Sequence, residues 1–377
     1  MLITHGPAPS ALSGESPADP GEAAKAVRAF VEFPGGAPDK LDWQTYDHCA
    51  ALTRLYAVYD RFVAELVAEF ILLLPRLYLK YADLPPDLIK HHRIGIGQIL
   101  LKMGEKGRYK NLEEGAVVQE LAAGLSGSSY TLVADAFFVD RQNLRFDVLC
   151  RLLSGLGFKH SGRYINQHAA VSEFIKSERA DSSSAQKELE EFIDYRNEAA
   201  HKRVENLLGV DQISAVGRFL TALGTALADM FEEGVLYRRM ELNQYKSVMT
   251  VAETHYGGQV VIGTPGIGTR IDVGDELIVV SGNVCRRVTV ETLRLNGQPS
   301  EGVTADGIFE VGLRLNKRSP KGADLRRLEI PAEVPQEMQL NLEEFMQSLD
   351  DAADTDAADA LEQQDSDPAD ADETGAA

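Results

Sequence analysis

The sequence predicts a protein of two parts, an all-α domain over residues 41–245 followed by a small β-barrel over residues 246–330. Apolar residues recur every three or four positions in the first part, as expected for amphipathic helices. The second part holds short alternating or Val- and Ile-rich segments separated by Gly and Asn, as expected for strands and turns. Residues 1–40 and 331–377 lack both patterns, so we expect a disordered leader and an acidic disordered tail.

The helical part is expected to begin near Asp42 with one long helix that Pro75 ends or kinks. Asn143 is the expected cap of the helix that follows it, and Ser183 with Gln186 has the spacing of a capping box. The expected later helices cover residues 86–103, 112–125, 130–138, 144–156, 162–176 and 185–208, and a last long helix starts at Asp211. We predict no strand between residues 41 and 243.

The barrel is predicted from five strand segments in about eighty residues. These segments are residues 247–251, 259–262, 276–280, 286–295 and 309–315. A Gly-rich run at residues 263–268 lacks the Gly-Lys-Ser/Thr ending of a phosphate-binding loop, so we assign it to a turn.

Charge and cysteine content narrow the class of protein. The formal net charge is −20, but residues 341–377 contain thirteen Asp and Glu and no Lys or Arg, which leaves −7 for the first 340 residues. This balance argues against broad nucleic-acid coating and leaves room for a narrow site.

The three cysteines are far apart, which favours reduced thiols and a cytoplasmic protein. We expect no signal peptide, no membrane span and no cofactor. Adjacent His91 and His92 would lie on different helix faces, so we expect no metal site.

One helix places an arginine where a core residue is expected. With about 100° per residue from Leu189, Arg196 falls near −20°, in the middle of a stripe that includes Phe192, Ile193 and Ala200. Asn197 and His201 then fall near 80° and 120°, at the edge of the stripe. A buried guanidinium needs a partner, and Glu188 and Glu190 on the same helix point elsewhere.

If Arg196 faces a cleft or a dimer interface, a phosphate bound there would be the partner of its guanidinium. His201 would exchange protons with a ribose hydroxyl or the leaving oxygen, and Asn197 would orient the imidazole or the substrate. These groups suffice for cutting RNA by attack of its own 2′-hydroxyl. The other interpretation also stays open: Arg196 pairs with an acid from another helix, and His201 is a surface residue.

The segment Arg196-Asn197-Glu198-Ala199-Ala200-His201 resembles the motif of the HEPN superfamily, an arginine and polar residue followed by histidine on a late helix of an all-α bundle. Residues 55–63 resemble the first-helix pattern of a larger prokaryotic HEPN subgroup, with Tyr59-Asp60 where Trp-Glu is usual. Residues 143–149 and 155–157 resemble its middle segment. Lys202 stands where a glycine is usual. The resemblance implies a homodimer in which two motif helices form one RNA-cutting cleft, with Asp60 supporting the catalytic residues.

Residues 273–277, 288–290 and 306–307 resemble the second domain of translational GTPases such as elongation factor Tu, although an unrelated six-stranded barrel is an equal alternative. The resemblance implies docking to tRNA or the ribosome. The chain's densest basic run lies beside this barrel and is either a solvated loop or an RNA contact; it consists of Arg314, Lys317, Arg318, Lys321, Arg326 and Arg327. The candidate RNA-binding residues are Lys202, Arg203, Arg314, Lys317, Arg318 and Lys321.

Three functions follow as hypotheses. The first is a metal-independent RNA endonuclease acting as a toxin or an anti-phage effector. The second is a non-catalytic RNA-binding or protein-interaction module, and the third is a toxin neutralised by an antitoxin partner. The acidic tail either aids solubility or competes with RNA for the basic run.

Overall fold

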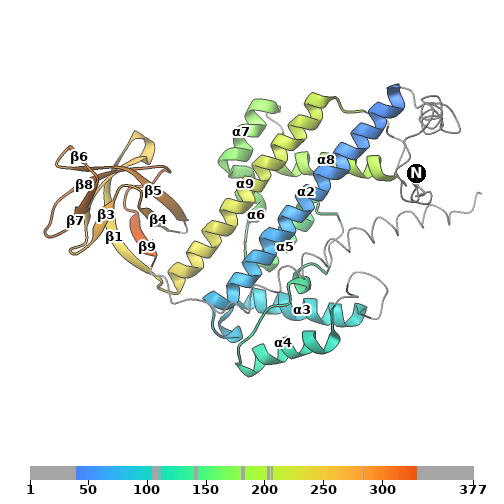
Figure 1. The fold of residues 1–377 in the computed structure, drawn as a ribbon, viewed down its shortest axis with the longest axis horizontal. Coiled ribbons are helices and arrows are strands. Elements are labelled where there is room, and N and C mark those ends of the chain that lie inside the picture. Colours follow the sequence, from blue (N-terminus) through green and yellow to red (C-terminus); the bar gives the residue numbers. More distant parts are fainter. Residues whose placement is uncertain are drawn as a thin grey trace, which may run out of the picture.

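The computed structural model describes residues 40–103, 109, 112–139, 143–179, 183–201, 204, 207–282 and 284–328. Helices fill the described chain up to residue 241 and strands follow, which confirms an all-α part and a small β-barrel (Figure 1). The predicted leader and acidic tail lie outside the described residues. The α-helices are α2 (Lys40–Leu77), α3 (Pro86–Lys102), α4 (Glu114–Ser126), α5 (Phe146–Gly155), α6 (Ser161–Gln167), α7 (Ala169–Glu178), α8 (Ala185–His201) and α9 (Val210–Glu241).

The two long helices α2 and α9 contact each other and form the frame of the helical part, and α8 lies across them (Figure 1). Pro75 lies inside α2, which continues to Leu77, so the proline does not end the helix. A proline there removes one backbone hydrogen bond from the last turn, where its cost is small because the helix is about to end. The buried side of α2 packs into one apolar core with α8 and α9.

Three predicted helices differ from the structure. Residues 130–138 contain only a short 3-10 turn, η2 (Ala134–Phe137), and the predicted helix over 162–176 is divided into α6 and α7. His168 divides them: its backbone is extended, and its Nδ1 accepts the N–H of Ala170 at 3.3 Å, so it caps α7. The helix predicted over 185–208 ends at His201.

The start of α8 is capped one residue later than predicted. The hydroxyl of Ser184 accepts the N–H of Lys187 at 3.2 Å, which is the bond of an N-cap residue. Ser183 instead donates to the buried carboxylate of Glu188 at 2.6 Å, and Arg179 donates to the same carboxylate at 2.8 Å. Glu188 therefore points away from Arg196, as predicted.

The barrel is closed by six antiparallel strands in the order β4, β9, β1, β2, β8, β5 and back to β4. The predicted strand segments correspond to β1, β2, β4, β5 and β8, while β9 lies in the run that was noted only for its charge. The strands are β1 (Tyr245–His255), β2 (Val260–Pro265), β3 (Arg270–Asp272), β4 (Glu276–Ser281), β5 (Val284–Leu295), β6 (Gln298–Ser300), β7 (Gly302–Thr304), β8 (Val311–Leu315) and β9 (Asp324–Leu328). A 3-10 turn, η3 (Tyr256–Gly258), joins β1 to β2.

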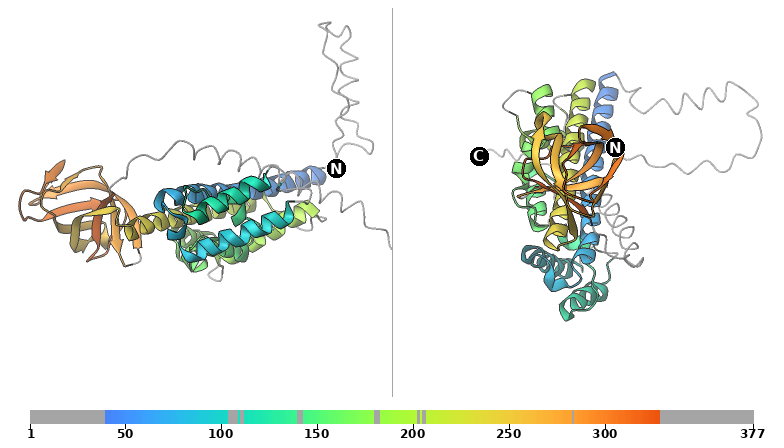
Figure 2. Two further views of the ribbon diagram at one scale, coloured as in Figure 1. Left: turned by 90° about the horizontal axis from the view of Figure 1, so that it is seen from below. Right: turned by 90° about the vertical axis from the view of Figure 1, so that its left-hand side faces the viewer.

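The barrel is joined to the helical part through the end of α9 (Figures 1 and 2). Leu236 of α9 packs with Tyr245, Ile278 and Cys285 of the barrel in a small core of its own. Beside it, Arg287 of β5 donates to Glu232 of α9 at 2.7 Å. The junction therefore combines apolar packing with ion pairs.

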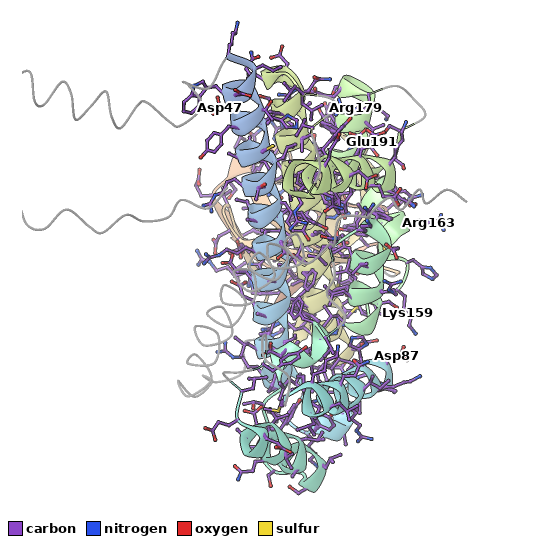
Figure 3. The ribbon with its side chains drawn as sticks, turned by 90° about the vertical axis from the view of Figure 1, so that its right-hand side faces the viewer. Asp47, Asp87, Lys159, Arg163, Arg179 and Glu191 are labelled. Atoms are coloured by element: carbon purple, nitrogen blue, oxygen red, sulfur yellow. The ribbon has the colours of Figure 1, made fainter. Side chains whose placement is uncertain are left out.

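Another ion pair connects two segments of the bundle: Lys159, after α5, lies 3.2 Å from Asp87 at the start of α3 (Figure 3). Among the described residues, no helix is long and apolar enough to span a membrane.

Candidate functional site: an uncompensated arginine on α8

The N-terminal half of α8 is fixed by apolar packing. Leu189, Phe192 and Ile193 are all buried, as the sequence pattern predicted. Ala200, predicted to share that stripe, is exposed and lies one residue before the end of α8. The C-terminal turn of α8 is thus at the edge of the core, where its polar residues border solvent.

Arg196 is half-buried and held by neutral groups. Its Nη1 donates to Oδ1 of Asn143 at 3.1 Å and to Oδ1 of Asn197 at 3.0 Å. Its Cζ lies 4.2 Å from the centre of the Tyr56 ring, which is cation–π geometry. Its Nε is buried and has no hydrogen-bond partner, and no carboxylate pairs with the guanidinium, among the residues that the structure describes.

Two tyrosines of α2 fix the segment that carries Asn143. The hydroxyl of Tyr56 accepts the N–H of Leu144 at 3.2 Å, and the hydroxyl of Tyr59 donates to the carbonyl of the same residue at 3.0 Å. Arg145 then donates to Asp194 of α8 at 2.6 Å. These bonds hold the segment against α8, so the amide of Asn143 reaches Arg196 from outside the helix.

Asn143 was predicted to cap α5, but the residue before that helix is Arg145. Asn143 has a left-handed backbone, with φ of 34°, a conformation that asparagine tolerates better than most residues. Sequence reasoning therefore missed Asn143 and Tyr56 as neighbours of the candidate catalytic residues. Both lie within segments that carry the HEPN resemblance, which is the one signal that could have singled them out.

Asn197 is half-buried, and its amide oxygen is already bonded to Arg196. His201 is the last residue of α8, and its side chain lies outside what the structure describes. Residues four apart share one side of a helix, so the backbone puts His201 on the side of Asn197. Asp60 is half-buried on α2, four residues after Tyr56 and on the same side of that helix.

Four of the six candidate RNA-binding residues lie among the described residues, and two of these four are in ion pairs. Lys202 and Arg203 lie outside the described residues. Arg314 of β8 donates to Glu291 at 3.2 Å, and Lys317 lies 3.9 Å from Asp229 of α9. Arg318 and Lys321 are exposed between β8 and β9.

The end of the basic run is part of the barrel. Arg326 and Arg327 lie in β9, where they pair with Asp324 and Asp275. The run is therefore divided between ion pairs within the fold and two exposed cations, Arg318 and Lys321, that form no ion pair with any described residue.

The helical bundle that carries Arg196 is of the HEPN class. The model of the RiboL-PSP-HEPN family matches residues 26–233, more than half of the chain, and the protein belongs to this family. The match supports a nuclease or another RNA-related module.

Two further comparisons were made. No curated protein matches the sequence. A similar solved structure is the selenomethionine variant of the C-terminal domain of a Geobacillus thermoleovorans protein assigned as a U32 peptidase. It is 10% identical, with a TM-score of 0.20, and covers 22% of this chain and 99% of its own.

Proposed function

We propose that this protein is a metal-independent RNA endonuclease, acting as a toxin or an anti-phage effector. The observation that carries the proposal is the guanidinium of Arg196, which is held by Asn143, Asn197 and the Tyr56 ring and has no compensating carboxylate among the described residues. A fixed and uncompensated guanidinium is a binding site for an anion, and its planar fork matches two oxygens of a phosphate.

The reaction needs three contributions from the chain. Arg196 binds the phosphate between two nucleotides and stabilises the charge that grows on its oxygens. His201 exchanges protons: the 2′-hydroxyl loses its proton, its oxygen bonds to phosphorus, the bond to the 5′-oxygen breaks, and that oxygen gains a proton. Asn197 orients the guanidinium through its hydrogen bond. The products are a 2′,3′-cyclic phosphate and a 5′-hydroxyl.

The test is RNA cleavage by the full chain in excess EDTA, with the new ends identified by sequencing. We expect cutting to survive chelation and to fall by at least about a hundredfold in Arg196→Ala and His201→Ala, the range for acid–base and electrostatic groups. Arg163→Ala and His255→Ala are matched controls, because both side chains are exposed and outside the site. RNA binding without cutting would instead support the non-catalytic module.

We also propose that the active form is a homodimer in which the ends of two α8 helices meet. Large apolar side chains are exposed where α2 and α9 begin: Leu41 is 58% exposed, Trp43 55%, Tyr46 65% and Val210 81%. The backbone N–H of Leu208, just before α9, donates to His48 of α2 at 3.2 Å, so these two helix starts are adjacent. The chain segment that follows His201 leads to this end of the bundle.

Trp43 is the single tryptophan of the chain, so its fluorescence reports directly on this surface. We expect its emission to shift to shorter wavelength as protein concentration rises, together with a doubling of the mass measured by light scattering. Tyr46→Asp should keep the protein monomeric and inactive. A monomeric protein that cuts RNA at full rate would contradict the dimer but leave the nuclease in place.

A further inference from the structure

A groove on the outer face of the barrel is separate from the α8 site. It crosses β2, β8 and β5, and its volume is about 540 Å³, within the roughly 300 to 1,000 Å³ usual for ligand sites. Gly312 of β8 forms its floor, between Ile262 of β2 and Arg294 of β5 in the strand register. The groove exists because this central position has no side chain.

The rim of the groove has the side chains that recognise single-stranded nucleic acid. Tyr256 is 84% exposed in the turn η3, where its φ of 50° is unusual for a tyrosine. Arg294 and Arg314 line the same groove together with Glu310, and Arg314 is paired with Glu291. Arg318 lies against the turn itself, since a Cβ built on Gly257 would be 3.8 Å from its Cζ. An exposed aromatic ring stacks on a base, and arginines bind the backbone or stack in turn.

The charge of the barrel supports this ligand. Residues 246–328 contain eleven Lys and Arg against nine Asp and Glu, in a chain whose net charge is −20. The barrel therefore has a net charge of +2 (11 − 9), whereas the rest of the chain is net negative, so a phosphate backbone is repelled less by the barrel than by the rest of the protein.

Part of the length of α9 separates the barrel from the N-terminal end of that helix. Lys317, next to Arg318, contacts Asp229, which is nineteen residues along α9 from Val210. At 1.5 Å per residue this is about 28 Å along the helix. On the order of eight stacked nucleotides, at roughly 3.4 Å each, cover that length.

We infer that this groove binds single-stranded RNA by stacking a base on Tyr256 over the floor at Gly312, and that it holds the substrate for the α8 site. Only the second of these two claims, that the groove holds the substrate for the α8 site, rests on the proposed nuclease. Binding at the groove is independent of cutting.

The test measures affinity with the full chain carrying His201→Ala, so that the RNA stays intact. The probe is a fluorescein-labelled twenty-nucleotide oligouridylate, read by anisotropy, with a duplex RNA and an acidic peptide as competitors. Three substitutions change the groove: Tyr256→Ala removes the stacking ring, Arg294→Gln removes a charge, and Gly312→Val fills the floor. An added Cβ at Gly312 meets its nearest atom, in Arg294, at 3.9 Å, so the larger residue fits without disturbing the sheet.

Two controls match these variants. Ile267→Ala truncates another exposed side chain of the barrel, 75% exposed, and Gly307→Val adds bulk where a Cβ meets nothing within 4 Å. We expect each groove variant to bind the RNA about tenfold more weakly, in line with the loss of one stacking contact, and both controls to bind as the parent does. Urea unfolding midpoints identical to the parent's would show that the folds are intact.

The failures are distinguishable. Unchanged affinity in all three groove variants, or no binding of single-stranded RNA by the parent, overturns the groove inference whatever the result of the cleavage test. Competition by duplex RNA or the acidic peptide at lower concentrations than by unlabelled single strand also overturns it. A protein that binds through the groove but never cuts overturns the nuclease and leaves the groove in place.

Discussion

The guanidinium of Arg196 lies over the ring of Tyr56, with 4.2 Å between Cζ and the ring centre. This contact joins α8 to α2 at the point where the candidate site begins. The same tyrosine accepts the N–H of Leu144 through its hydroxyl, so one side chain supports both Arg196 and the segment of Asn143.

Two substitutions separate these roles of Tyr56. Tyr56→Phe keeps the ring but leaves the N–H of buried Leu144 unpaired, so we expect a loss of about 1 to 3 kcal/mol in the free energy of unfolding and little change in cleavage rate. Tyr56→Leu also removes the cation–π contact, so cleavage should fall by about a further tenfold. Urea unfolding and initial cleavage rates measure the two effects. Equal cleavage rates in both variants would show that the ring does not hold Arg196 for catalysis.

Asn143→Asp tests whether Arg196 must remain uncompensated. The change replaces one oxygen acceptor 3.1 Å from Nη1 by a carboxylate of the same shape, and asparagine and aspartate both tolerate the positive φ. The new ion pair would occupy the guanidinium, so we expect cleavage to fall by about thirty- to a hundredfold, with unfolding stability unchanged or raised.

The control for that experiment is Gln167→Glu, which adds the same charge at an exposed position at the end of α6. Steady-state cleavage and RNA affinity would be measured for both variants. Full activity in Asn143→Asp would mean that Arg196 does not contact a phosphate during the reaction.

Much of the fold follows from local patterns, because helices such as α3, α4 and α5 have their own apolar periodicity and end signals. The errors occur where tertiary contacts decide. The 130–138 segment is apolar enough for a helix. However, the hydroxyl of Tyr130 donates to the carbonyl of Tyr78, and the N–H of Val133 donates to His92. These two hydrogen bonds hold the segment in the core in an extended conformation. Strand β9, which closes the barrel, was not predicted, because its charged residues hide the alternation typical of a strand.

The site was predicted to the extent that it lies on one helix. The positions of Arg196 and Asn197 around α8 could be predicted from a helical wheel, because a helical wheel needs only local geometry. Asn143 is 53 residues away in the sequence, and its contact depends on a segment that Tyr56 and Tyr59 position from a third element. Such a contact has no local pattern, and only the packed structure shows that no described carboxylate pairs with Arg196.

His92 predicts a pH dependence of stability. Its ring is fully buried, with Nδ1 3.0 Å from the hydroxyl of Tyr81 and Nε2 accepting the N–H of Val133, and burial lowers its pKa to about 4. In the unfolded chain the imidazole of His92 binds a proton near pH 6.5. The stability that the neutral, buried imidazole contributes to the folded chain is therefore present above that pH and is lost as pH falls toward 4. At pH 5 the loss is about 2 kcal/mol.

His92→Gln keeps an acceptor for the Val133 N–H and cannot titrate in this range. The variant should therefore lose about 2 kcal/mol less than the parent between pH 7.5 and pH 5, by urea unfolding. His255→Gln, at an exposed position, is the control. Identical pH profiles for the His92 variant and the parent would show that folding does not lower the pKa of this imidazole.

Leu236 predicts how the two parts unfold. It is 3% exposed and joins α9 to Tyr245, Ile278 and Cys285 of the barrel. Leu236→Ala should cost about 2 to 5 kcal/mol at the junction and divide one calorimetric transition into two. Glu232→Gln, which breaks the partly exposed pair with Arg287, should cost less than about 1 kcal/mol and keep one transition. Two transitions already present in the parent would show that the domains are uncoupled.

The acidic tail predicts a salt-dependent restraint on RNA binding. Residues 341–377 contain thirteen acids and no cation, and the tail and RNA would compete for Arg318 and Lys321, two exposed cations of the barrel. Deleting the tail should raise RNA affinity several-fold at low salt, and the gain should disappear near 0.5 M salt, roughly, because screening removes both interactions. A full-length variant with those acids changed to Asn and Gln should match the deletion, since charge and not length is responsible. Equal affinities of the full and shortened chains at low salt would leave solubility as the role of the tail.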